Sequence, residues 1–169
     1  AAPGGKTTQM AAMMKNQGAI HAIELNQIRY QRLLYNLNKQ GATIVNTVCQ
    51  DGAQIGKRYP NTYDKVLLDA PCSGEGLFLT SNKNTYRNWK RKLINNCLKT
   101  QRRLLNSAIL AAKPSGLILY STCTINPEEN ELIINQALQQ FPGQISIEKI
   151  KLNIPHSIPG VTSLGNHQL

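Results

Sequence analysis

The sequence contains no hydrophobic run long enough to cross a membrane and no signal-like segment at its start. A membrane-spanning helix is indicated by about 18 or more consecutive apolar residues, and no such run occurs here. We therefore expect a soluble, cytoplasmic protein without membrane contact. There is also no internal repeat and no low-complexity segment. With 169 residues, 41% of them hydrophobic, the chain is long enough for one domain with a buried core.

Paired cysteines are absent as well. The four cysteines, at positions 49, 72, 97 and 123, show no C-x-x-C spacing. Structural zinc sites usually show such pairs, and disulfide-stabilised secreted domains are short and dense in cysteine. The sequence therefore predicts neither a metal site nor a disulfide framework. We expect Cys49 and Cys97 to be core residues, whereas Cys72 and Cys123 each stand shortly after a short apolar run.

Acidic residues are scarce, and none lies between Glu75 and Glu128. The net charge is +10, and nearly all of the excess falls in this third of the chain, on Lys83, Arg87, Lys90, Arg91, Lys92, Lys99, Arg102, Arg103 and Lys113. A solvated basic face is one interpretation. The other is a track for a polyanion, in which Tyr86 and Trp89 offer stacking surfaces among the charges.

The chain does not begin with methionine, and residues 1–8 already form a Gly-rich loop motif. Such a loop usually follows a strand that aims the amides of the next helix at a ligand. Because no such strand precedes Ala1, we expect this sequence to be a piece of a longer protein.

Hydrophobic periodicity predicts alternating helices and strands. We expect helices at residues 8–16, 26–40, 94–112 and 127–140, and strands at residues 19–23, 43–48, 63–68, 117–120 and 145–150. Residues 53–62 are expected to form a loop, and residues 75–92 an irregular segment. This alternation is typical of an α/β fold with a mostly parallel sheet and helices on both faces.

Polar residues stand where these strands end, and open α/β sheets bind ligands at that edge. Glu24 is placed to accept both hydroxyls of a ribose, and Asp51 can accept from an adenine amino group, although each could also be a loop cap. Their spacing behind Pro3-Gly4-Gly5 indicates an adenosine-containing cofactor. Two further strand ends carry Asp69 to Gly74 and Ser121 to Thr124. Two cysteines and a carboxylate there would attack an electrophilic ring carbon and handle protons.

A P-loop nucleotide hydrolase is the alternative interpretation of the same residues. Gly5-Lys6-Thr7 also resembles the end of a phosphate-binding loop, and Asp69 could be the strand-ending acid that holds magnesium. That interpretation needs a glycine immediately before Ala1. It also leaves Cys72 and Cys123 without a task.

Together the motifs resemble the RNA cytosine-C5 methyltransferase family of the Nol1/Nop2/Sun type, which includes RsmB/RsmF-like members. The resemblance runs in order through residues 1–7, 24, 50–52, 69–74, 121–124 and 126–130. It implies a Rossmann-like fold that binds S-adenosyl-L-methionine, with the first and last strands of the sheet missing from this sequence. It also implies one shortened catalytic domain over residues 1–169, of which residues 142–169 are weakly specified.

The resemblance also assigns roles to residues. Cytosine C5 is too poor a nucleophile to take a methyl group directly, so a thiolate must first add at C6. The family match makes Cys123 that nucleophile and gives Cys72 a part in product release. DNA cytosine methyltransferases use the Pro-Cys cysteine for attack, so the reversed assignment stays open. Asp69 would bind the N3/N4 edge of cytosine, and Lys6 would lie near the methionine end of the cofactor and lower the pKa of the thiol.

The cofactor-binding residues expected from these motifs and this resemblance are Ala1, Ala2, Pro3, Gly4, Gly5, Lys6, Glu24, Arg29, Asp51 and Asp69. Arg29 matches a family arginine, although it could equally be a surface charge. The expected substrate is RNA with a flipped cytidine, converted to 5-methylcytosine by a monomeric enzyme. Ribosomal RNA is preferred, transfer RNA is the alternative, and a non-catalytic RNA-binding remnant is a further one.

Overall fold

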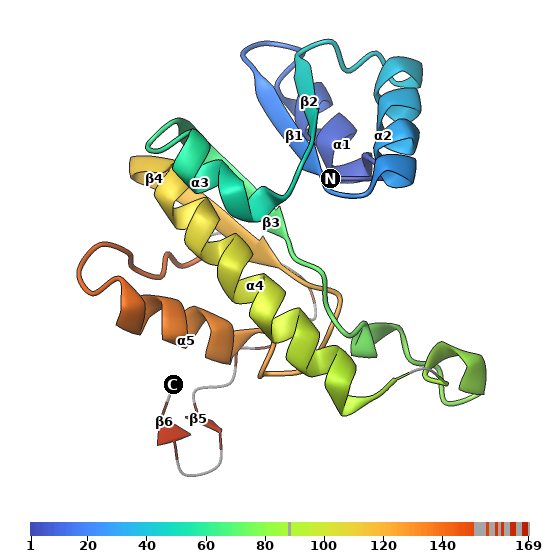
Figure 1. The fold of residues 1–169 in the computed structure, drawn as a ribbon, viewed down its shortest axis with the longest axis vertical. Coiled ribbons are helices and arrows are strands. Elements are labelled where there is room, and N and C mark those ends of the chain that lie inside the picture. Colours follow the sequence, from blue (N-terminus) through green and yellow to red (C-terminus); the bar gives the residue numbers. More distant parts are fainter. Residues whose placement is uncertain are drawn as a thin grey trace.

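A computed structural model describes residues 1–87, 89–150, 155, 158, 160, 163–164 and 167–168 (Figure 1). The helices are α1 (Gly5–Met13), α2 (Gln27–Lys39), α3 (Ile55–Arg58), α4 (Arg91–Ala111) and α5 (Glu131–Gln140), with short 3-10 turns η1 (Gly52–Gln54), η2 (Glu75–Leu77) and η3 (Lys83–Thr85). The strands are β1 (Ile20–Glu24), β2 (Val45–Cys49), β3 (Tyr63–Asp69), β4 (Ala112–Ser121), β5 (Ser163–Leu164) and β6 (His167–Gln168).

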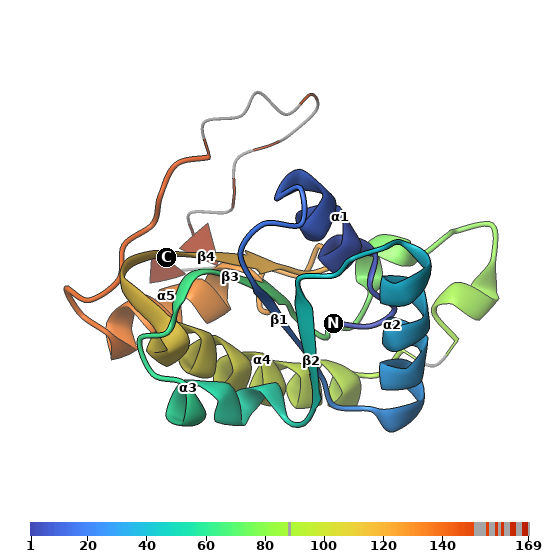
Figure 2. The ribbon, with the colours of Figure 1, turned by 90° about the horizontal axis from the view of Figure 1, so that it is seen from above.

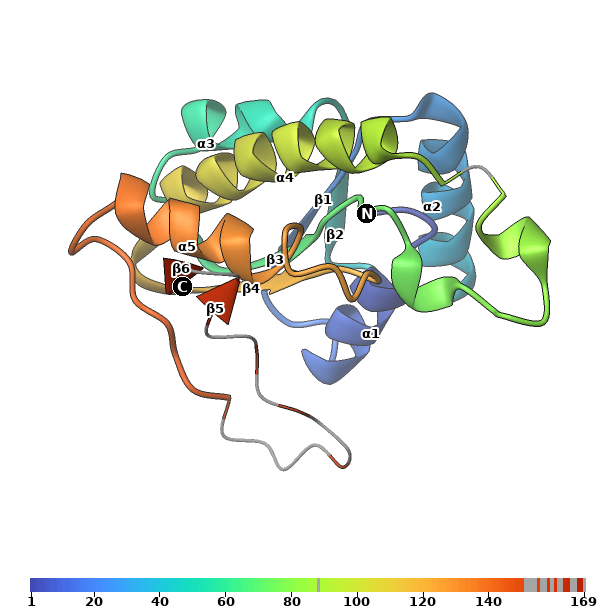
Figure 3. The same cartoon turned by 90° about the horizontal axis from the view of Figure 1, so that it is seen from below.

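The main strands are parallel and lie between layers of helices, as a Rossmann-like fold requires. β1 pairs with β2, and β3 pairs with β4, each in parallel register. Figures 2 and 3 show α3 and α4 on one face of these strands and α1 on the other. The predicted α/β class with helices on both faces is confirmed.

The two parallel pairs do not join into one sheet within the described residues. A cavity of about 870 Å³ lies between them, lined by side chains of β1 and of β3. A side-chain hydrogen bond links the pairs, between His21 Nδ1 and Tyr63 Oη at 2.7 Å. The facing edges of β1 and β3 are therefore free of backbone pairing to each other in the described part of the chain.

Two apolar clusters hold the helices to the strands. In the larger one, α4 and α5 pack through Ile94, Leu98, Leu105, Ile133 and Ala137, whose spacing within each helix places them on one face. In the smaller one, the first loop packs against β1 and α2 through Ala2, Ala22, Leu33 and Leu37. The larger cluster therefore lies beneath β3 and β4, and the smaller one anchors the Gly-rich loop.

Several sequence predictions differ from the structure. Residues 53–62 are not simply a loop, because Asp51 caps η1 through a hydrogen bond from Ala53 N at 2.9 Å and α3 follows. Residues 145–150 form no strand. The prediction that Cys49 is a core residue is wrong: it is exposed, and its thiol donates to Gln27 Oε1 at 2.9 Å. Cys97 is buried, as predicted.

The C-terminal part is described only in pieces. Most of residues 151–169 lie outside the described residues, and β5 and β6 form a short antiparallel pair there. None of the helices that the structure describes is long and apolar enough to cross a membrane.

Candidate active site

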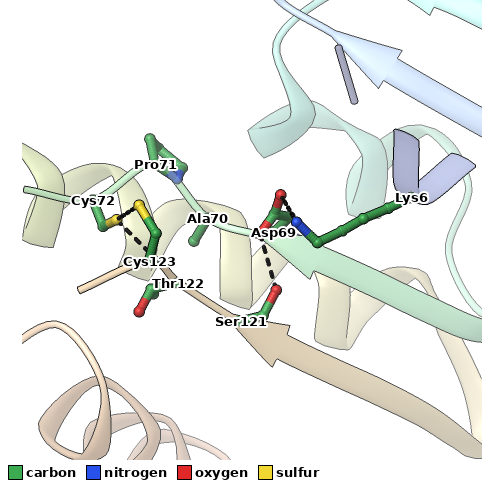
Figure 4. A pocket seen from close by; sticks show the side chains of 8 residues that line it. All are labelled: Lys6, Asp69, Ala70, Pro71, Cys72, Ser121, Thr122 and Cys123. Carbon is green, nitrogen blue, oxygen red and sulfur yellow. Dashed lines mark hydrogen bonds and ion pairs between the residues drawn. The ribbon is translucent and has the colours of Figure 1, made fainter. Parts of the chain in front are cut away.

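Strand register brings the two cysteine motifs together. In the β3–β4 pair Asp69 lies beside Ser121. The chains stay side by side past the strand ends, because Ala70 N donates to Ser121 O at 2.8 Å. Figure 4 shows the resulting pocket of about 270 Å³, lined by Lys6, Asp69, Ala70, Pro71, Cys72, Ser121, Thr122 and Cys123. The structure therefore brings together the residues that the sequence predicted for catalysis.

The thiols of Cys72 and Cys123 point at each other in this pocket. Their sulfur atoms are 3.0 Å apart, and the backbone N–H of Cys123 donates to Cys72 Sγ at 3.3 Å. Cys72 is half-buried and Cys123 is exposed. Burial, and then the hydrogen bond with the Cys123 thiol, raise the pKa of Cys72 to about 11. Cys72 is therefore a neutral thiol at physiological pH, whereas Cys123 is the accessible partner.

This difference predicts slow alkylation of Cys72. The thiolate is the reactive form, and a thiol with a pKa of about 11 is about 0.1% ionised at pH 8, against about a quarter for one with a pKa of about 8.5. We expect iodoacetamide to modify Cys72 slowly at pH 8, and the rate to rise about tenfold per pH unit up to pH 10. Peptide mass spectrometry measures this, with exposed Cys49 as the internal control. A rate for Cys72 that is already constant below pH 9 would contradict the raised pKa.

The carboxylate at the end of β3 is held from two sides. Lys6 Nζ lies 2.7 Å from Asp69 Oδ2, and Ser121 Oγ donates to Asp69 Oδ1 at 3.0 Å. Both Lys6 and Asp69 are about half exposed, with side-chain exposures of 57% and 50%. The pair therefore keeps its orientation while each group can still reach a ligand in the pocket.

Gly76 fixes the position of the segment that passes over Cys123. Its N–H donates to Cys123 O at 3.1 Å, and a Cβ at this position would lie 2.6 Å from the same oxygen. Real Cβ atoms essentially never approach an oxygen this closely, so the contact requires glycine. Gly76 thereby packs directly on the backbone of Cys123.

The larger cavity adjoins this pocket, and Lys6, Asp69, Ala70 and Pro71 line both. Of the predicted cofactor-binding residues, all except Gly4 line it: Ala1, Ala2, Pro3, Gly5, Lys6, Glu24, Arg29, Asp51 and Asp69. The cavity also extends between the facing strands β1 and β3 and over α4, so only its part beside the Gly-rich loop, Glu24 and Asp69 is the candidate cofactor site. A Gly-rich loop with carboxylates at the strand ends fits an adenosine-containing cofactor.

Gly4 does not line this cavity, but it allows the Gly-rich loop to pack against α2. Its φ of +113° lies in the left-handed region, and a Cβ there would meet Leu33 Cδ1 at 3.0 Å. Arg29 has a related task, because its Nη2 donates to Ala2 O at 2.6 Å. Both residues therefore fix the conformation of the Gly-rich loop. Arg29 is not simply a charged surface residue, which was one of the two interpretations of the sequence.

Glu24 is a buried carboxylate on the cavity wall. It accepts from Ala2 N at 3.0 Å and from Asn26 N at 3.0 Å. Burial acts to raise the pKa of Glu24, the hydrogen bonds from Asn26 N and Ala2 N act to lower it, and the net shift is downward. A carboxylate has about four acceptor positions. With two backbone donors in place, Glu24 keeps acceptor positions for a ligand.

Asp51 also has partners already. One oxygen caps Ala53 N, and the other accepts from Arg103 Nη2 at 2.8 Å. The loop-cap interpretation of Asp51 therefore applies, while the residue still lines the cavity.

Sequence reasoning missed the polar network behind the Cys72 loop. Glu129 and Gln101 are both fully buried, at 0% exposure, and Glu129 accepts from Ser73 N at 2.9 Å and from Gln101 Nε2 at 3.0 Å. In the sequence Glu129 looked like its neighbour Glu128, as an acid in the first turn of a helix. Only its place in the motif of residues 126–130 hinted at a separate role.

The chain is similar in sequence to known RNA methyltransferases. Residues 1–161 match the family model described as "16S rRNA methyltransferase RsmB/F". A "Ribosomal RNA small subunit methyltransferase F" from Erwinia tasmaniensis is 42% identical over 150 residues, which cover 89% of this chain and 31% of the relative. A "tRNA (cytosine(49)-C(5))-methyltransferase" from Pyrococcus abyssi is 41% identical over 159 residues, covering 94% and 50%.

Solved structures agree as well. NSun6 from Pyrococcus horikoshii with SFG superposes with a TM-score of 0.79 at 30% identity, covering 91% of this chain and 38% of that one. A methyltransferase homologue from the same organism gives 0.70 at 37% identity, covering 83% and 43%. This chain spans about a third of the length of the curated relatives named methyltransferase F, at 31% to 34% of each.

Proposed function

This chain belongs to the 16S rRNA methyltransferase RsmB/F family, a family of RNA cytosine-C5 methyltransferases, and on that premise we propose that it supplies the catalytic centre of an S-adenosylmethionine-dependent enzyme forming 5-methylcytosine in RNA. The observation that carries the proposal is the pair of thiols 3.0 Å apart beside Asp69. Family membership also argues against the alternative of a P-loop nucleotide hydrolase.

Cys123 is the nucleophile in this proposal. Its thiol is exposed in the pocket, whereas Cys72 is half-buried and its pKa is raised to about 11. The Cys123 thiolate adds to C6 of the cytosine ring, so that a sulfur–carbon bond forms and C5 gains electron density. Asp69 lies in the same pocket and hydrogen-bonds the N3/N4 edge. The Lys6 ammonium beside it brings positive charge to the ring as the ring gains electrons.

S-adenosylmethionine, when bound, supplies an electrophilic methyl group. Glu24 and the Gly-rich loop would hold its adenosine part, and Lys6 would lie near its methionine end, since all of them line the same cavity. Cys72 then assists release: a water molecule accepts the C5 proton, the electron pair of that C–H bond re-forms the C5=C6 double bond, and the bond between Cys123 and C6 breaks with its electron pair returning to the Cys123 sulfur. The neutral Cys72 thiol, 3.0 Å away, can donate a hydrogen bond to that departing sulfur.

The direct test uses the full-length protein with methyl-labelled S-adenosylmethionine. We expect label in 5-methylcytosine after nucleoside digestion of ribosomal RNA, because several relatives are named as ribosomal RNA small subunit methyltransferases. Transfer RNA is assayed in parallel, because another relative is named as a tRNA methyltransferase. Binding of either RNA without methyl transfer would favour a non-catalytic remnant.

The RNA substrate would lie along the basic segment between residues 83 and 113, in which some of the charged side chains already have protein partners. Arg91 pairs with Glu128 and Arg103 with Asp51, and Arg102 donates to Gln136. Lys90, Lys92 and Lys99 are exposed, and they are the candidates for phosphate contact.

Replacing Lys90, Lys92 and Lys99 together by glutamine is expected to weaken RNA binding at low salt. Removing one phosphate contact lowers the slope of log affinity against log salt by about 0.7–0.9, so the slope should fall by about 2. Filter binding over a salt series measures this slope. Lys39→Gln, which replaces an exposed lysine on α2, is the control. If Lys39→Gln lowers the slope equally, Lys90, Lys92 and Lys99 do not form a specific RNA-binding surface.

A further inference from the structure

We propose that Glu129 is a positioning residue that fixes the loop carrying Cys72 and so keeps the Cys72 thiol aimed at Cys123. The measurement of turnover rests on the proposed function, whereas the measurement of Cys72 alkylation does not depend on it.

The contacts of Glu129 converge on the residues around Cys72. Its Oε1 accepts from Ser73 N at 2.9 Å, and its Oε2 accepts from the Ser73 hydroxyl. The same Oε1 accepts from Gln101 Nε2 at 3.0 Å, and that nitrogen also donates to Pro71 O at 2.9 Å. One carboxylate, with Gln101 of α4, therefore holds the residues on both sides of Cys72.

The network reaches the second cysteine motif as well. The Ser73 hydroxyl lies 3.1 Å from Thr124 Oγ1, and Thr124 directly follows Cys123. Tyr120 Oη donates to the backbone carbonyl of Glu129 at 2.7 Å, which ties β4 to the start of α5. The loop after β3, the loop after β4 and the entry to α5 thus share one buried group.

Burying a carboxylate is costly unless donors satisfy it. Glu129 has no exposed surface, and it lies close to the apolar cluster of α4 and α5. Its hydrogen bonds go to the backbone and hydroxyl of Ser73 and to a Gln101 side chain that itself holds Pro71. The carboxylate also hydrogen-bonds the buried Cys97 thiol of α4, so it joins the Cys72 loop to α4. The Cys72 loop depends on it for the bonds to Ser73, and its removal should displace Cys72.

The test compares Glu129→Ala with Glu129→Gln and Glu128→Ala in the full-length protein. Glutamine can keep the Oε1 bonds, and the Ser73 hydroxyl can turn to accept from its amide, so this variant should rescue most of the function. Glu128 is the matched control, because it is the adjacent acid but bonds to Arg91 at the surface.

Two readouts are measured. Alkylation of Cys72 at pH 8 should rise about tenfold in Glu129→Ala, because a displaced thiol becomes exposed. Turnover should fall about 10²-fold, since misplacing a catalytic group by about 1 Å costs that much, with KM for RNA unchanged and covalent protein–RNA adduct accumulating. Glu128→Ala should stay within about twofold of wild type on both readouts.

The outcomes separate the two proposals. If wild type transfers no methyl group, the proposed function fails, while Cys72 alkylation still decides the role of Glu129. A folded Glu129→Ala with wild-type alkylation of Cys72 overturns the positioning role, whatever its melting temperature. If Glu129→Ala does not fold, Gln101→Leu replaces it, because it removes the bond to Pro71 and one bond to Glu129. Unchanged Cys72 reactivity there overturns the inference equally.

Discussion

Replacing Cys123 by alanine in the full-length protein is expected to abolish both methyl transfer and the covalent protein–RNA adduct. Loss of a covalent nucleophile costs on the order of 10⁴-fold or more in turnover, because no other group lining the pocket can form the bond to C6. Cys72 is a poor replacement, since it is half-buried and burial, the largest cause of its raised pKa, does not depend on the Cys123 thiol. Label transfer to RNA and a denaturing gel measure the two quantities.

Cys72→Ala should give the opposite pattern on the gel. The bond to C6 still forms through Cys123, but release is impaired, so the adduct accumulates while turnover falls. Cys49→Ala is the control, because Cys49 is exposed and its thiol bonds to residues near the start of α2. If Cys72→Ala is free of adduct and inactive while Cys123→Ala still methylates, the two roles are reversed.

Asp69→Asn is expected to lower kcat by about 10²- to 10³-fold, the typical cost of removing one preorganised electrostatic group. The amide keeps the shape of the side chain but loses the charge that Lys6 neutralises at 2.7 Å. It also changes which atoms face the N3/N4 edge of the base. Single-turnover methyl transfer with saturating RNA measures the chemical step directly.

The same strand offers a matched control for that experiment. Asp64 also lies on β3 and also binds a lysine, Lys113, at 2.7 Å, but it lies outside the pocket. Asp64→Asn should therefore leave turnover within about twofold of wild type. Equal losses in the two variants would mean that Asp69 only stabilises the strand.

The sequence was most informative where local signals and strand ends coincide. α2 was predicted to within one residue at each end, because Asn26 caps its start through Arg29 N and Gly41 follows its end with φ +62°. The carboxyl ends of β3 and β4 were predicted to within one residue, although β4 begins at Ala112 rather than at residue 117. Parallel pairing at those carboxyl ends was enough to bring Asp69, Cys72 and Cys123 to one edge.

Other features depend on contacts that no local pattern reports. α3 has four residues, too few to show a helical period. The expected strand at 145–150 had the right composition, but a strand needs a partner, and none pairs with it among the described residues. Glu128 and Glu129 are chemically identical neighbours, and only the packing of α4 against α5 shows that one is at the surface and the other is buried. The backbone donors on Glu24, Ala2 N and Asn26 N, could not be predicted from the sequence either.

The open edges of β1 and β3 affect how these 169 residues behave as a separate molecule. Unpaired strand edges present rows of free N–H and C=O groups, which are templates for pairing with another chain. Here two such edges line one cavity of about 870 Å³, so a strand from a neighbouring copy has a ready place to insert. We therefore expect these residues to self-associate when they are concentrated on their own.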